Sequence, residues 1–506
     1  MNDRQQDLDR QLSRLEYLVQ SSLEKKGATS GTLNLRYPQQ PLPQRSNEHQ
    51  AKQTWISRDP DPVDDTTPVN GSFKFLSRYS DKTANGNISN RFSGDIFPSP
   101  SQVFLLWEVF KENVAPVVPI IHKPSFEAYL MEMAATPEKM DLNRKALLLV
   151  VFLSTVISMT DEECVRDLDD TRPQLLTTYK EAITSIFSRM RVLETRNLTL
   201  LQAFVLYLSC TRKYLEETSY VWAMTTVALR LARNMNLHRD GASIGMDPFE
   251  TEMRRRIWWH ICFLDVQCSE HQGTESDVLD MCFDTHLPSN VNDDDIMPRA
   301  AQPIKEQMAV TEMTYAIVRY EAILEVRRMR ESMNTSQQYL PVSDIGYCEG
   351  KWRQAVQNLS QRLWVGYVSH CDPTNPTNQL YIGLARVVPK MAFIIHQPIM
   401  RSIPVQTDAL DWNFSSAVEA LEFCRFLDYS PETIKWKWHF RQSSGRCYIL
   451  TLLLAELCVR PPCPLVERAW LAIRSAYKEW AMVASVNEMT AISKLMQRAL
   501  SLRGPQ

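Results

Sequence analysis

The sequence predicts an all-α protein: a large multi-helix body preceded by a short coiled-coil-like helix and a disordered linker. Apolar residues recur at helical spacing, as Val103, Leu106, Trp107 and Phe110 do. Glycine is scarce, at 14 of 506 residues, which argues against the glycine-rich turns of doubly wound enzymes. No two alternating apolar runs are joined by a hairpin turn. These observations favour helices around a sizeable core.

Residues 1–26 are predicted to form a short amphipathic helix. Leu8, Leu12, Leu15 and Val19 alternate spacings of four and three residues, which is the seam of a coiled coil. Two heptads are marginal on their own. The segment is therefore either a dimerisation helix, which would make the chain a homodimer, or a solitary amphipathic helix.

Residues 27–95 are predicted to be a flexible linker, and residues 96–506 to be the all-α body. The linker is rich in Pro, Gln, Asn, Ser and Asp, and it cannot bury enough apolar surface to offset its ordering entropy. After a first helix that opens near residue 97, helices are expected over residues 142–159, 172–191, 198–212, 217–235, 248–270, 305–333, 349–366, 376–396, 412–427, 444–458 and 465–482.

The stretch "EMRRRIWWHICFLD", residues 252–265, places three arginines directly before two tryptophans. In a helix the arginines at 254–256 fan across about 200°, whereas a helix that reads a DNA groove gathers its basic residues on one face. The following residues are apolar in every direction, so Trp258 and Trp259 are predicted to lie in the core. The arginines would then stand at the mouth of that core.

The same interpretation buries Asp265, and a buried carboxylate needs a cation or a hydrogen-bond donor. Arg230 and Arg233, on the preceding predicted helix, are the candidate partners. The stretch is thus interpreted as a packed helix with internal charge pairs, with DNA contact as the alternative.

Composition excludes several function classes. The formal net charge of −3 predicts weak non-specific binding to phosphate backbones. The longest apolar run, residues 146–159, is shorter than the roughly 20 residues that span a bilayer, so no membrane association is expected. The N-terminus lacks a signal-peptide pattern, and the 11 cysteines are expected to be reduced thiols in a cytosolic or nuclear protein.

Two patterns leave room for other chemistry. "DLDD", residues 167–170, matches the acid motif of class II terpene cyclases, although an exposed acidic cluster beside a helix start is the simpler interpretation. A zinc site could be sought among His260, Cys262, Cys268, His271, Cys282 and His286. His260 and Cys262 point about 160° apart on one helix, so structural thiols are favoured over metal ligands. An all-α enzyme stays the third hypothesis.

Three further blocks flank this stretch. They are "LWEVFKENVAPVVPIIHKPSF" (residues 106–126), "ALRLARNMNLHRDG" (228–241) and "THLPSNVNDDDI" (285–296). Together, in this order, the blocks resemble the regulatory region of fungal zinc-binuclear-cluster transcription factors, most strongly over residues 100–300. The family commonly has glycine where Asn236 stands; asparagine is the usual second choice at a left-handed helix end.

The resemblance implies a core of signature residues: Arg230, His238, Arg239, Arg254, Arg255, Arg256, Trp258, Trp259, Asp265, Pro288 and Asn290. It also implies an N-terminal zinc module with six cysteines, but this chain has no cysteine before Cys164 and no CxxC pair. We therefore expect no metal or other cofactor in this chain, and zinc only if such a module precedes it. Either the module is missing from the sequence, or the chain is a DNA-independent co-regulator.

The function expected from the resemblance is that of a nuclear transcriptional regulator. Because many members of the family control specialised-metabolite gene clusters, such a cluster is the expected target. Promoter DNA would be reached through the missing module or a partner, and the body would recruit the transcription machinery. A pocket for an effector is predicted from His122, Phe126, Arg230, His238, Trp258 and Asp265. The alternative is that all six are packing residues.

Overall fold

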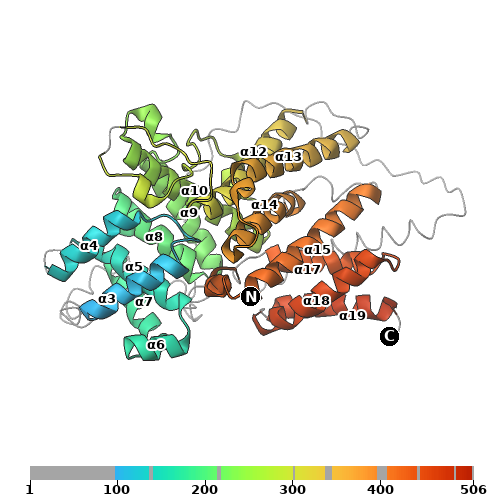
Figure 1. Cartoon of the computed structure of the whole chain (residues 1–506), viewed down its shortest axis with the longest axis horizontal. Helices are drawn as coiled ribbons and strands as arrows, with labels where there is room; N and C mark the ends of the chain where they lie inside the picture. Colours follow the sequence, from blue (N-terminus) through green and yellow to red (C-terminus); the bar gives the residue numbers. More distant parts are fainter. Residues whose placement is uncertain are drawn as a thin grey trace, which may run out of the picture.

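The computed structural model describes residues 97–135, 141–212, 218–299, 302–336, 345–395, 407–440, 445–483 and 486–503. These residues form seventeen α-helices joined by loops and short 3₁₀ turns, and no strand occurs among them (Figure 1). The predicted all-α class is confirmed for this part of the chain. The predicted N-terminal helix, with Leu8, Leu12, Leu15 and Val19, and the predicted linker lie outside the described residues.

The first half of the body is built around one helix that is buried on all sides. Its helices are α3 (Pro100–Asn113), α4 (Lys123–Ala135), α5 (Leu142–Ser158), α6 (Asp161–Leu168), α7 (Arg172–Arg189), α8 (Leu198–Thr211) and α9 (Thr218–Asn234). Helix α5 packs against α3, α7 and α8, and every residue from Ala146 to Ile157 is buried. An apolar pattern without a polar face requires such an environment, so "ALLLVVFLSTVI" forms the centre of this half.

Helix α9 ends as its sequence predicts. Asn236 has φ 60°, and the amide of Leu237 donates to the carbonyl of Ala232 while the amide of Asn236 donates to that of Arg233. These two bonds are the Schellman pattern, in which the residue after the cap adopts the left-handed conformation. The η4 turn (Gly241–Ile244) then leads into the next helix.

Helix α10 (Pro248–Gln272) joins the two halves, since it packs against α8 and α9 and also against α11 (Asp277–Asp280) and α12 (Thr314–Ser336). Its start is encoded locally: the side chain of Asp247 accepts from the amide of Glu250, and proline occupies the first turn. Gly273, at φ 71°, ends it.

The second half consists of further helices, most of which contribute to a separate apolar cluster. They are α13 (Ile345–Gly366), α14 (Pro376–Ile395), α15 (Thr407–Tyr429), α16 (Lys437–Phe440), α17 (Gly445–Leu457), α18 (Pro464–Val483) and α19 (Val486–Arg503). Helices α14, α15, α17, α18 and α19 share this second cluster, which includes Phe414, Leu453 and Ile473. Figure 1 shows these orange and red helices on one side of α10 and the blue and green helices on the other.

One predicted helix begins in the wrong place. The expected range 305–333 starts only at Thr314, because the preceding backbone bonds to another loop. The side-chain amide of Asn290 donates to the carbonyls of Gln307 and Ala309, both at 2.7 Å, and the side-chain oxygen of Asn292 accepts from the amide of Glu312 at 3.1 Å. Among the described helices, none has the length and apolar character needed to cross a bilayer.

Candidate functional site

The tryptophans of α10 are buried, as the sequence pattern predicts. Trp258 is 0% exposed and Trp259 is 1% exposed. The indole N–H of Trp259 donates to the carbonyl of His286 at 2.8 Å, and both indoles meet the ring of Phe283 edge-on. Indole rings held in this way are unavailable to a nucleic acid, which excludes base stacking by this helix.

The three arginines of α10 go to three different intramolecular partners. Arg254 donates to the carbonyl of Met235 at the end of α9. Arg255 donates from Nε and Nη2 to the two carboxylate oxygens of Asp240, both at 2.8 Å. Because consecutive helical residues point about 100° apart, each reaches a different neighbouring element. Arg256, which points elsewhere again, is the most deeply buried of the three.

Arg256 occupies the centre of a buried ion network. Its Nε donates to Glu252 at 3.0 Å and its Nη1 to Asp293 at 2.6 Å, and all three side chains are at most 6% exposed. The prediction that the arginines stand at the mouth of the core is therefore wrong for this residue. Paired carboxylates compensate the guanidinium, so it can lie inside.

Asp293 ties the network to the beginning of α4. The backbone amide of Lys123 donates to its carboxylate at 2.9 Å, and Nε2 of His122 lies 3.0 Å from its carbonyl oxygen. Burial acts to raise the pKa of Asp293, but the charge of Arg256 and these hydrogen bonds outweigh it and lower the pKa. The network thus joins segments that are 170 residues apart in the chain.

The carboxylate of Asp240 is a second buried negative charge, and it pairs with Arg255. Burial alone would raise the pKa of this carboxyl. The hydrogen bonds from Arg255 and from the amides of His286 and Ala242 lower it to about 2. Asp240 therefore stays ionised and fixes the loop before α10 to the loop after α11. Arg239, next to it, is exposed and pairs with Asp284 at 3.1 Å.

Asp265 is buried as expected, but its predicted arginine partners are wrong. Arg230 and Arg233 are both exposed on α9. The carboxylate instead accepts from the hydroxyl of Ser276 at 2.6 Å and from the amide of Val278 at 3.1 Å. Burial raises its pKa. Asp265 therefore caps the start of α11, which the turn at Gly273 brings back against α10.

The remaining signature residues serve the same packing. His238 lies half-buried with its ring centroid 6.3 Å from that of Trp258. Pro288 is buried. The buried side chain of Asn290 accepts from the hydroxyls of Thr311 and Thr314 as well as donating to the loop before α12. Arg230 and Arg239 do not belong to the core at all, because both are exposed.

The six residues predicted to form an effector pocket do not line the cavity that lies between the two halves of the body. Phe126 packs against Trp107, with ring centroids 4.7 Å apart, His122 belongs to the Asp293 network, and Arg230 is exposed. The cavity described next includes none of the six, Trp258 and Asp265 among them. It does not support that prediction.

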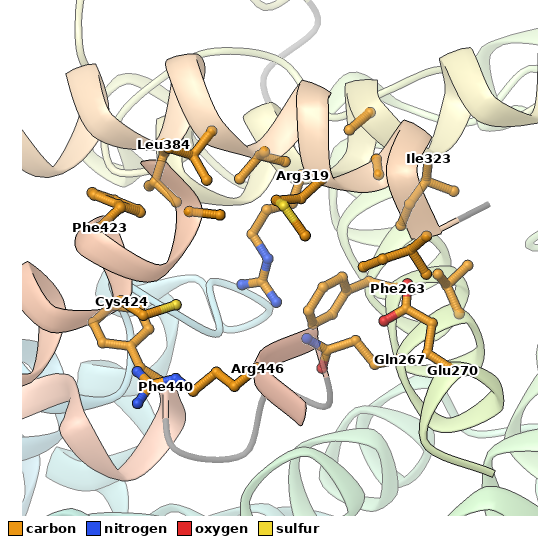
Figure 2. Close-up of a pocket in the computed structure, with 18 of the residues that line it drawn as sticks. Phe263, Gln267, Glu270, Arg319, Ile323, Leu384, Phe423, Cys424, Phe440 and Arg446 are labelled. Atoms are coloured by element: carbon orange, nitrogen blue, oxygen red, sulfur yellow. The ribbon is translucent and has the colours of Figure 1, made fainter. Parts of the chain in front are cut away.

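A cavity of about 210 Å³ lies where the two halves of the body meet. Its wall comes from α10, α11, α12, α14, α15, α16 and α17 (Figure 2). Most of the lining is apolar, as at Phe263, Ile323, Leu384 and Phe423, and Figure 2 shows the side chain of Arg319 extending among these residues. Cavities of this kind are the usual places for small-molecule sites.

Sequence reasoning missed Arg319. It lies in "TYAIVRYEAI" at the start of α12, among residues that are buried on both sides of it. A basic residue inside an otherwise apolar helical run is the available signal. Without knowing what faces α12, however, that pattern is equally typical of an arginine whose charged end reaches solvent.

The candidate enzyme and metal residues are placed elsewhere. Asp169, the third residue of "DLDD", is exposed at the end of α6 with φ 60°, and Asp167 pairs with the exposed Arg166. Among the described residues no group of three or more His, Cys, Asp or Glu side chains is arranged to hold a metal ion. Burial raises the pKa of the Cys262 thiol well above its ordinary value, so it is a packing residue.

Comparisons with known proteins agree with the sequence resemblance. Residues 107–344 match the fungal specific transcription factor domain. The chain is 28% identical to the pyriculol/pyriculariol biosynthesis cluster transcription factor 1 of Pyricularia oryzae, over 87% of this chain and 60% of that protein. It is 28% identical to the aurofusarin cluster transcription factor aurR2 of Gibberella zeae, over 76% and 57%.

A third relative is the C6 finger domain transcription factor hasF of Aspergillus fumigatus, 27% identical over 67% of this chain and 50% of that protein. The chain therefore spans half to three-fifths of the length of these curated relatives. The matched domain contains both the α10 network and Arg319.

Proposed function

We propose that this chain, which belongs to the family of the fungal specific transcription factor domain, is a transcriptional regulator of a specialised-metabolite gene cluster. The observation that carries the proposal is the match over residues 107–344, together with relatives that are named as cluster transcription factors. The proposed place of action is the nucleus, and the α-helical body is the regulatory part.

The body itself is proposed to act without touching DNA. The basic residues of α10 are engaged with Met235, Asp240, Glu252 and Asp293, and the whole chain carries a formal net charge of −3. Phosphate binding requires accessible, clustered cations. Promoter contact would therefore come from a zinc module outside these residues or from a partner that carries one, and this chain would need no cofactor of its own.

The proposal assigns no catalysis to the chain. The acidic residues of "DLDD" are at an exposed helix end, away from the cavity, and Asp169 accepts a hydrogen bond from Gln102 at 3.4 Å. A cyclase acid instead needs an enclosed site in which its proton is delivered to a bound substrate.

Two measurements test the proposal. Deleting the gene should change the transcripts of one contiguous biosynthetic cluster together, and unchanged transcripts would contradict the proposal.

The purified chain should bind duplex DNA weakly, with dissociation constants no tighter than the 10⁻⁴–10⁻⁶ M typical of non-specific contacts. Tight, sequence-selective and salt-sensitive binding by the purified chain would show that the body reads DNA directly.

A reporter assay separates a regulatory body from a passive scaffold. The chain is fused to a heterologous DNA-binding domain, and transcription is measured from a promoter that carries the matching site. A changed reporter level is expected, and the same fusion with Arg256→Met should show a smaller effect because the buried carboxylates of Glu252 and Asp293, left without their cation, destabilise the body. An inert fusion would favour a co-regulator that acts only within a complex.

A further inference from the structure

The cavity between the two halves is lined by a buried positive charge, that of Arg319, which is not paired with a negatively charged residue of the described wall. Arg319 of α12 is 9% exposed and lines the cavity. Its guanidinium lies 3.4 Å from the ring centroid of Phe263 and 4.7 Å from that of Tyr315. The aromatic faces hold the planar cation in place, but they do not neutralise its charge.

No carboxylate of the described chain forms an ion pair with Arg319. Its one hydrogen bond there runs from Nη1 to Nε2 of His439, at 3.3 Å. Burial lowers the pKa of His439 well below its ordinary value, so this imidazole is neutral and contributes no negative charge. Burial also lowers the pKa of Arg319, which is the consequence of placing a cation in an apolar cavity.

The other charged residues of the cavity do not replace a counter-ion. Arg446 of α17 also lines it, but this arginine is paired with Asp428 at 2.6 and 3.1 Å. Glu270 of α10 also lines the cavity, and its charge acts on Arg319 through space without forming an ion pair with it. The buried cation with aromatic support and no paired anion is therefore specific to Arg319 within the described wall.

The rest of the wall is suited to an apolar molecule. Val387, Met391 and Ala392 of α14 and Phe423 of α15 line the cavity, and Figure 2 shows the labelled Phe423 and Leu384 on the opposite side of it from Phe263 and Ile323. A guanidinium at an apolar cavity recognises a carboxylate or sulfonate through two parallel hydrogen bonds. Apolar walls then accommodate the body of the ligand.

We propose that this cavity binds a small apolar molecule with one anionic group, whose oxygens accept hydrogen bonds from Arg319 while its apolar part packs between α10, α12, α14 and α15. The site differs from the six residues expected from the sequence. The idea that the ligand is an effector of transcription rests on the proposed function. The binding of the ligand to this cavity is independent of that function.

A matched pair of fluorescent probes tests the anionic requirement. 8-Anilino-1-naphthalenesulfonate and N-phenyl-1-naphthylamine share one apolar skeleton and differ by the sulfonate. The sulfonate should bind the full chain at one site, and Arg319→Met should weaken it by about tenfold or more, the value of a charged hydrogen bond. The neutral probe should bind both proteins within about twofold, because its contacts are apolar.

Three controls keep the result interpretable. Arg166→Met removes an exposed arginine of α6 and should leave both affinities unchanged. Arg319→Lys keeps the charge and should retain part of the sulfonate affinity. Ala392→Phe fills the cavity and should abolish binding of both probes. Equal sulfonate affinity in the unchanged chain and Arg319→Met, or unaltered binding after Ala392→Phe, would overturn the proposal.

Competition extends the test to carboxylates. Decanoate should displace the bound sulfonate probe from the unchanged chain more effectively than decan-1-ol, and this preference should disappear in Arg319→Met. An equal effect of acid and alcohol would overturn the anionic requirement. All of these readouts are fluorescence from purified protein, so they can fail while the reporter and transcript measurements succeed, and the converse is also true.

Discussion

Two buried arginines of the same body have opposite surroundings. Arg256 on α10 is 1% exposed and bonds to two carboxylates, Glu252 and Asp293. Arg319 on α12 is 9% exposed and has two aromatic rings and a neutral imidazole around it. Both arginines lose most of their hydration, but only Arg256 recovers an ionic partner from within the described chain.

The difference separates structural charge from charge suited to binding. A buried guanidinium between two carboxylates joins distant segments and leaves no capacity for a ligand, as the contacts of Asp293 with α4 show. A buried guanidinium that lines a cavity and is not paired with a carboxylate keeps donors for an anion. Burial alone would not distinguish these roles; the identity of the neighbours does.

The largest expected effect is the loss of the structural arginine. Arg256→Met should lower the free energy of unfolding by about 3–5 kcal/mol, because it leaves Glu252 and Asp293 buried without their cation. Urea unfolding followed by tryptophan fluorescence measures the change. The triple variant Arg256→Met, Glu252→Gln and Asp293→Asn should recover part of it, since the uncompensated charges are then gone. A single variant as stable as the unchanged chain would remove one side of the comparison.

The fold was predictable where the chain's own pattern determines burial. Helix α5 and the middle of α10 after Arg256 are apolar in nearly every direction, and the burial of Trp258 follows from that pattern, while local cap residues set the ends of α10. The left-handed Asn236 is likewise local. The start of α12 was not predictable, because residues before Thr314 bond to Asn290 across a loop. Pairing between distant loop segments leaves no periodic signal in the sequence.

The charge pairs were less predictable than the helices. Sequence spacing shows that the arginines of α10 diverge, but it does not reveal which element faces each of them. Asp265 finds its donors eleven and thirteen residues later rather than on α9, because a glycine turn reverses the chain. Arg319 becomes distinctive only when α14, α15 and α16 are placed around it. Partner identity depends on tertiary contacts.

The next largest expected effect is a pH dependence of the unfolding free energy that is due to His260. His260 of α10 is buried, with Nε2 2.8 Å from the hydroxyl of Ser209 and Nδ1 3.2 Å from that of Tyr320. Burial, with the charge of Arg319, lowers its pKa from 6.5 to about 3. As the pH drops below about 6.5, the His260 imidazole therefore binds a proton in the unfolded chain but stays neutral in the folded chain. The free energy of unfolding consequently falls as the pH drops from 7 towards 3.

The size of this effect follows from the two pKa values. At pH 5 the proton uptake costs about 2 kcal/mol relative to neutral pH. His260→Gln removes the titrating group and keeps a hydrogen-bonding side chain, so its unfolding free energy should vary less between pH 7 and pH 5 by about that amount. Urea unfolding at a series of pH values measures the slope. Parallel curves for the two proteins would show that folding does not change the protonation of the His260 imidazole, which would contradict the lowered pKa.

The smallest expected change in stability is at Arg319, and it is the sharpest test of the comparison. Arg319→Met relieves a desolvated charge but loses the contacts with Phe263 and Tyr315. These terms oppose each other, so the unfolding free energy should change by less than about 1 kcal/mol. The same urea titration used for Arg256→Met provides the measurement. A loss as large as that of Arg256→Met would mean that Arg319 is a structural residue with a strong partner. A near-zero change in the unfolding free energy, combined with a large loss of sulfonate binding, is the pattern of a residue that binds a ligand. In that case the bound anion, and no carboxylate of the described chain, provides the negative charge that pairs with Arg319.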